Sequence, residues 1–130
     1  MQNTKIQSYK DLVVWQKSVD LVVEVYKLTA QFPQEEKFGL TSQMTRAAVS
    51  IPSNIAEGRA RSTRKDFANF IGISYASAAE LETQVIIAKR LSFSKDLTYN
   101  VVDALLEQIL KMLGTMRIKL RSLPASSSNL

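Results

Sequence analysis

Apolar residues recur at helical spacing through almost the whole chain. In the first long segment, one seam consists of Leu12, Trp15, Val19, Val22 and Tyr26, and a second consists of Val14, Leu21, Val25 and Leu28. Together they form an apolar face that is wider than one bundle core needs. Asp11 stands where an N-cap or first-turn acid assists a helix, and Phe32-Pro33 ends the pattern. We therefore predict a helix over residues 11–31.

A second helix is predicted over residues 38–60, although it contains a proline. Its apolar side is marked by Leu40, Met44, Ala47, Ala48, Ile51, Ile55 and Ala60. Pro52 removes one backbone N–H and costs about 3 kcal/mol relative to alanine in a helix interior. We expect it to bend the helix toward the core. Asn54 is expected to satisfy backbone groups freed near Pro52.

Two further helices follow, each introduced by a capping signal. Ser62 or Thr63 followed by Asp66 resembles a capping box and predicts a helix over residues 64–91. Its heptad seam consists of Phe67, Ile71, Ser74, Ala78, Leu81, Val85 and Ala88. Ser94 as N-cap, with Asp96 in the first turn, predicts the last helix over residues 95–121. Its two seams are Leu105, Ile109, Met112 and Met116, and Val102, Leu106, Leu110 and Leu113.

Four such helices with short connections predict an all-α fold, an antiparallel up-down-up-down four-helix bundle over residues 1–124. A length of 130 residues is enough for one domain with its own core. Residues 125–130 are mostly Ser and Asn, and we predict a disordered tail there.

This topology gathers scattered charges at one end, because the N-terminus, the connection between the second and third helices and the C-terminus meet there. The net charge is only +5, but this end collects Lys5, Lys10, Arg59, Arg61, Arg64, Lys65, Arg117, Lys119 and Arg121 against Asp11, Glu57 and Asp66. We predict that nucleic-acid phosphates are bound by Arg59, Arg61, Arg64, Lys65, Arg117, Lys119 and Arg121. The alternative is that these cations complement helix dipoles and maintain solubility. Apart from Tyr9 and Phe67, aromatic residues do not interleave these basic residues, so base stacking is not predicted.

The chain contains no histidine and no cysteine, which limits its chemistry. An imidazole base, a Glu-x-x-His di-iron site and a zinc site built on Cys or His are excluded. Glu57, Glu80 and Glu82 suggest a carboxylate metal site, but ion pairs with Arg46 or Arg59 are the better interpretation without histidine. We expect no catalytic residue, metal or cofactor, and therefore no enzyme.

The surplus apolar face of the first helix, which includes Val13 and Val23, predicts a homo-oligomer. Trp15, at a seam position, is expected to anchor the core or an interface. No apolar run approaches the roughly 20 residues of a membrane span, and the N-terminus lacks a signal-peptide stretch. We expect a cytoplasmic protein with no membrane contact.

Several sequence blocks carry a family resemblance: YKDLVVWQK (9–17), GLTSQMTRAA (39–48), SIPSNIAEG (50–58), DF (66–67) and AELETQ (79–84). With this order and spacing, the chain resembles the four-helix-bundle family of 23S ribosomal RNA intervening-sequence proteins. The family motif falls here on Trp15, Arg46, Pro52, Asn54, Glu57, Gly58 and Glu80. Thr45 stands where the family often has a second basic residue.

The resemblance implies a homopentameric ring with a basic outer surface and no catalytic residues. Related members are accessory proteins of diversity-generating retroelements, which bind nucleic acid and a reverse transcriptase. Our first hypothesis is a non-catalytic, oligomeric nucleic-acid-binding bundle. The alternative is a protein-interaction scaffold for an acidic partner protein, such as a reverse transcriptase or another nucleic-acid enzyme.

Overall fold

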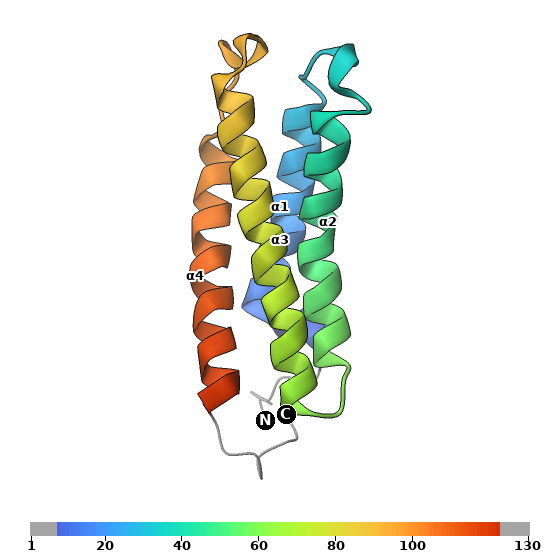
Figure 1. Ribbon diagram of the computed structural model, residues 1–130, viewed down its shortest axis with the longest axis vertical. Coiled ribbons are helices and arrows are strands. Elements are labelled where there is room, and N and C mark those ends of the chain that lie inside the picture. Colours follow the sequence, from blue (N-terminus) through green and yellow to red (C-terminus); the bar gives the residue numbers. More distant parts are fainter. Residues whose placement is uncertain (1–7, 123–130) are drawn as a thin grey trace, which may run out of the picture.

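The computed structural model describes residues 8–122 and has four helices that lie side by side in alternating directions (Figure 1). They are α1 (Val13–Thr29), α2 (Leu40–Arg59), α3 (Arg64–Arg90) and α4 (Asn100–Ser122). Three short 3₁₀ turns are Tyr9–Asp11, Gln34–Glu36 and Ser92–Ser94. The predicted all-α four-helix bundle is confirmed. Lys5 and the predicted tail lie outside the described residues.

The core runs along the predicted seams of α2 and α3. All seven seam residues of α3 are buried, including the small Ser74 and Ala78 that let neighbouring helices approach. On α2 the buried positions include Met44, Ile51 and Ile55. The prediction for Ala60 is wrong, because this residue is exposed and Gly58 is buried in its place at the end of α2.

One of the two seams of α1 faces the core. Val14, Leu21, Val25 and Leu28 are buried, whereas Trp15, Val19 and Val22 are half-buried. Tyr26, which ends the other seam, is 54% exposed. A four-helix bundle encloses only the inward stripe of each helix, so part of the wide apolar face of α1 remains at the surface.

The two capping predictions have different outcomes. The Thr63 hydroxyl accepts the Asp66 backbone N–H at 3.1 Å, so the predicted cap of α3 is confirmed. The predicted cap at Ser94 is wrong, because α4 begins at Asn100. The buried Ser94 hydroxyl donates to the Ala88 carbonyl and contacts the Tyr99 hydroxyl, both at 2.6 Å. Ser94 thus closes the end of α3 instead of starting α4.

The predicted first-turn role of Asp11 also changes. Asp11 belongs to the 3₁₀ turn before α1, where its carboxylate accepts the Ser8 backbone N–H at 3.2 Å. The Ser8 hydroxyl in turn accepts the Lys10 N–H at 3.1 Å. Leu12 is the N-cap of α1 and makes no side-chain cap there.

At Gly58, α2 closely approaches α3. A Cβ added at Gly58 would lie 2.6 Å from Cβ of Phe70 and 3.0 Å from Cδ1 of Phe67. Real Cβ atoms do not approach a backbone-linked carbon so closely, so the two helices would have to separate. At Gly114 of α4 the same test gives 3.5 Å to Cε1 of Tyr75, which is an ordinary contact.

We expect Gly58→Ala to lower the free energy of unfolding by about 1–3 kcal/mol, because overpacking outweighs the gain in helix propensity. Gly114→Ala is the matched control, and should be neutral or stabilising by up to about 1 kcal/mol. Urea denaturation of both variants measures the difference. An equal or larger stabilisation by Gly58→Ala would show that the close approach does not constrain the bundle.

Candidate nucleic-acid interface

The start of α1, the α2–α3 connection and the end of α4 meet at the lower end of the bundle in Figure 1. We call this the basic end, defined by Arg59, Arg61, Arg64, Lys65, Arg117, Lys119 and Arg121. Four of these side chains are exposed: Arg61, Lys65, Lys119 and Arg121. Arg59 and Arg117 are half-buried, and Arg64 is buried. The topology thus brings the seven residues to one end, but their environments differ.

Arg64 differs most from the prediction. It is only 4% exposed, and its Nε donates to the Leu120 carbonyl at 3.3 Å. The last four carbonyls of a helix have no partner within the helix, and a cation is favourable at that end. Arg64 therefore ties the start of α3 to the last turn of α4. A buried guanidinium that is already engaged is poorly placed to meet a phosphate.

Arg61 is partly neutralised. Its guanidinium lies 2.9 Å from the Glu57 carboxylate, one helical turn away, and 4.8 Å from the centre of the Phe70 ring. Both members of the ion pair are well exposed, so the pair is worth at most about 1 kcal/mol. The acid nevertheless lowers the positive potential on this side of the basic end.

Arg117 crosses from α4 to α3. Its guanidinium lies 4.8 Å from the centre of the Tyr75 ring. Phe70 and Tyr75 are therefore the aromatic residues beside the arginines, and the sequence analysis missed both. No local signal could have paired Tyr75 with Arg117, because the two residues belong to different helices and are about 40 positions apart in the sequence. Phe67, which it named instead, is buried in the core.

Helical register distributes the remaining cations around the basic end. Arg117 and Arg121 are four residues apart and share a side of α4. Lys119 follows Met112 by seven residues, and Met112 lines a groove between α4 and α1. Lys119 thus belongs to the α1 side, whereas Arg117 faces α3. The cations that the sequence predicted at one end of the bundle therefore lie on several faces of that end.

The motif around Pro52 forms a polar link between α2 and α3. The Asn54 amide donates to the Ser50 carbonyl at 2.8 Å and to the Ser50 hydroxyl at 3.0 Å. The Ser50 hydroxyl lies 2.8 Å from that of Ser77 on α3. The Ser74 hydroxyl donates to the Ile51 carbonyl at 2.9 Å. The carbonyls of Ser50 and Ile51, just before Pro52, therefore accept hydrogen bonds from side chains. The carbonyl that loses its helical N–H donor because of Pro52 is that of Ala48. The predicted bend at Pro52 stays a prediction.

The other motif residues lie apart. Arg46 and Glu80 are exposed on α2 and α3, and Glu57 pairs with Arg61 rather than with Arg46. Trp15 is half-buried and meets the Tyr9 ring edge-on, with the ring centres 5.3 Å apart. Within residues 8–122, no group of three or more acidic side chains is arranged to hold a metal ion.

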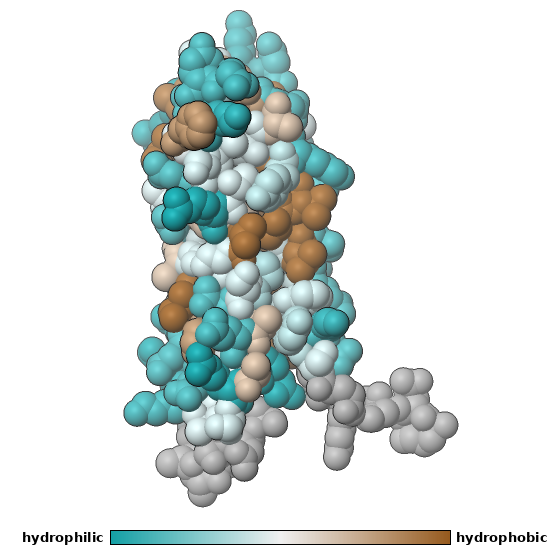
Figure 2. Space-filling model, turned by 90° about the vertical axis from the view of Figure 1, so that its right-hand side faces the viewer, coloured by the Kyte–Doolittle hydropathy of each residue, from teal (hydrophilic) through white to brown (hydrophobic). Residues whose placement is uncertain are grey.

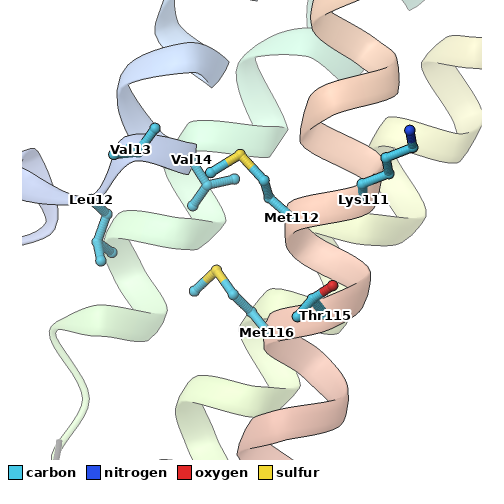
Figure 3. A pocket seen from close by; sticks show the side chains of 7 residues that line it. All are labelled: Leu12, Val13, Val14, Lys111, Met112, Thr115 and Met116. Atoms are coloured by element: carbon cyan, nitrogen blue, oxygen red, sulfur yellow. The ribbon is translucent and has the colours of Figure 1, made fainter.

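An apolar groove lies between α1 and α4 near the basic end. Figure 3 shows Leu12, Val13 and Val14 at the start of α1 facing Met112 and Met116 of α4. Lys111 and Thr115 complete its lining, and its volume is about 480 Å³. A second hollow of about 560 Å³ between the same helices is lined by Asp20, Val23, Glu24, Asn100, Val101, Ala104 and Leu105.

Apolar side chains are exposed elsewhere too. On the face on the α2 side, shown in Figure 2, hydrophobic side chains gather near mid-height, whereas hydrophilic ones predominate toward the lower end. The exposed large apolar residues of α1 and α2 are Val13, Val23, Tyr26 and Val49. Apolar surface also reaches the basic end, because Ile118, between Arg117 and Lys119, is 66% exposed.

Comparison with known proteins agrees with this architecture. The sequence profile described as 23S rRNA-intervening sequence protein matches residues 10–115. The chain belongs to this family. The match includes the α2–α3 connection with Arg59, Arg61, Arg64 and Lys65, but stops before Arg117, Lys119 and Arg121.

A solved structure also supports this family membership. It is a protein of unknown function from the S23 ribosomal protein family of Bacteroides thetaiotaomicron, with 27% identity and a TM-score of 0.73. The match covers 81% of this chain and 98% of that one. No curated protein matches the chain. None of the helices in the described part of the chain has the length and apolarity needed to cross a membrane.

We expect Arg64→Met to lower the free energy of unfolding by about 2 kcal/mol, because it removes a buried charged donor to the Leu120 carbonyl. Lys65→Met, at the next and exposed position, should change it by no more than about 0.5 kcal/mol. Urea denaturation monitored by circular dichroism compares the two. Equal stability of both variants would contradict the structural role assigned to Arg64.

Proposed function

We propose that this 23S rRNA-intervening sequence family protein is a non-catalytic, oligomeric four-helix bundle that binds the backbone of RNA or DNA at its basic end. The observation that carries the proposal is the concentration of accessible cations there. Lys65, Arg117 and Arg121 project from α3 and α4, and the chain has no acidic residue after Glu107. Clustered cations attract a phosphate backbone and release its counterions.

The unequal environments of the basic residues support a narrower set of phosphate ligands than the sequence predicted. Arg64 is engaged in the fold, and Arg61 has Glu57 beside it. Lys65, Arg117 and Arg121 are the stronger candidates, with Arg59 and Lys119 as contributors. Contacts of this kind depend on backbone shape and charge more than on base sequence.

The absence of histidine and cysteine in the sequence supports a binding role rather than catalysis. The proposal includes no cofactor, and it places the protein in the cytoplasm. In this proposal the protein binds nucleic acid and catalyses no reaction itself.

We propose that a second copy of the chain covers the apolar α1–α4 face. Val13 and Val23 of α1 and Val101 of α4 are exposed, and each lines one of the two hollows. An apolar stripe along two helices is of the kind that oligomers bury. The homopentamer implied by the family resemblance would use such a face in each subunit.

The alternative function is a scaffold for an acidic partner protein. The apolar groove supports it, because amphipathic helices dock into such grooves, while Lys111 in its lining is paired with Glu107 at 3.5 Å. Capture of one specific protein that persists after nuclease treatment, with no binding of RNA or DNA at low salt, would favour the scaffold.

Removing the charges of Lys65, Arg117 and Arg121 by glutamine substitution should weaken RNA binding. It should also reduce the slope of log K against log salt by about 2, since three contacts contribute about 0.7 each on a single strand. The matched control substitutes Lys37, Arg90 and Lys95, which are exposed outside the basic end and carry the same total charge. Fluorescence anisotropy over a salt series measures both variants. Equal losses in the two would mean that net charge, not the basic end, governs binding.

Val23→Glu should dissociate the oligomer to a mass near 14.6 kDa, because it places a charge in the proposed interface. The control is Ile87→Glu on α3, since Ile87 is 47% exposed and Val23 is 48% exposed. Multi-angle light scattering gives the masses, and circular dichroism checks folding. A wild-type protein that is monomeric at micromolar concentration would refute the oligomer.

A further inference from the structure

Two glycines, Gly72 of α3 and Gly114 of α4, lie inside helices along the contact between α3 and α4, toward the basic end. We call this part of the surface the α3–α4 seam. A helix-interior glycine costs about 1 kcal/mol relative to alanine. Packing explains Gly58, but it does not explain these two. A Cβ at Gly72 would meet Cδ of Arg117 at 3.7 Å, and one at Gly114 would meet Cε1 of Tyr75 at 3.5 Å. Both are ordinary contacts, so the monomer does not require glycine at either position. Bare backbone at these positions lets the Arg117 side chain and the Tyr75 ring lie close to the two helices.

Arg117 packs beside Gly72, and Tyr75 packs beside Gly114. The Arg117 side chain passes Gly72, and its guanidinium lies 4.8 Å from the centre of the Tyr75 ring. The Tyr75 ring itself rests near Gly114. A planar guanidinium that is held by a ring on one side can stack a second planar group on its other side. Unpaired nucleobases stack on arginine planes in this way.

The charges along the seam fit a phosphate backbone on either side of this stacked pair. Arg121 follows Arg117 by one turn, about 6 Å along α4, on the same side of the helix. Lys65 precedes Gly72 by two turns on α3. The sequence between Asp66 and Glu80 contains no acidic residue, and neither does the sequence after Glu107. Asp66 adjoins Lys65 at the start of α3, but Arg117 and Arg121 lie in an acid-free stretch of the sequence, whereas Arg61 is paired directly with Glu57.

We propose that this seam binds single-stranded RNA or DNA, with one base stacked on the Arg117 guanidinium and neighbouring phosphates held by Lys65 and Arg121. The inference rests on the nucleic-acid binding proposed above and names the class of ligand. A base offers its face to a guanidinium only when it is free of its neighbours, as in a single strand. A duplex keeps its bases stacked, so it offers only its phosphates to the seam.

The test separates planarity from charge. Arg117→Lys keeps the positive charge but removes the planar group, so the salt dependence should be unchanged. Affinity for a single-stranded oligonucleotide should fall about tenfold, the loss of one stacking contact. Affinity for the duplex of the same sequence should change less than twofold. Arg90→Lys, outside the basic end, is the control for the substitution itself, and urea denaturation confirms that both variants are folded.

A second measurement observes the stack directly. An oligonucleotide carrying 2-aminopurine should gain fluorescence on binding the wild-type protein, because the probe base leaves its neighbours in the strand, and this increase should disappear with Arg117→Lys. If Arg117→Lys binds single strands as tightly as wild type, with the same fluorescence increase, the stacking site is refuted while the basic end still stands as a phosphate-binding surface. If wild type prefers the duplex, the ligand class is refuted. If wild type binds neither, the proposed function itself fails.

Discussion

The close contact of α2 with α3 is the constraint on which the bundle depends. At one end of this contact, Gly58 permits a backbone approach that a single methyl group would prevent. About two turns earlier, the hydroxyls of Ser50 and Ser77 meet, and Ser74 donates to the Ile51 carbonyl. Small and hydroxyl-bearing residues are needed at these positions, because larger side chains would force the helices apart. Pro52 is tolerated beside this contact, where side-chain donors supplement the helical hydrogen bonds.

This contact also determines the geometry of the basic end. The connection from Arg59 to Arg64 spans only a few residues, so the spacing of α2 and α3 sets where its cations lie. Arg64 then links α3 to the final turn of α4 through the Leu120 carbonyl. One arginine thus serves the fold and brings the basic residues of α4 beside those of α3. Its neighbours remain exposed because their positions face away from the core.

The apolar α1–α4 side and the cationic α3–α4 seam suit two different kinds of contact. The α1–α4 side is apolar and hollowed, as oligomer interfaces are before they are buried. The α3–α4 seam at the basic end is cationic and carries a guanidinium held on an aromatic ring. A bundle that covers the first surface with its own copies leaves the second open to an anionic ligand. Apolar association and electrostatic association then do not compete for the same residues.

The sequence by itself determined the four helices, their order and the end at which the charges meet. Helical periodicity and short connections are local properties, and they restrict the topology to an antiparallel bundle. The seam of α3 was likewise readable from spacing alone, and the cap of α3 was narrowed to Ser62 or Thr63. The family motif was visible as well, although its residues do not form a single site.

The tertiary structure alone decided what each of these residues does. Arg64 and Lys65 are adjacent in sequence and equal in charge, yet one is buried against α4 and the other is exposed. The role of Ser94 depended on a carbonyl six residues earlier and on Tyr99, so its capping signal was misleading. Tyr75 acquired its arginine from a helix about 40 positions away in the chain. Burial and side-chain pairing depend on contacts between distant segments, and a local pattern does not contain them.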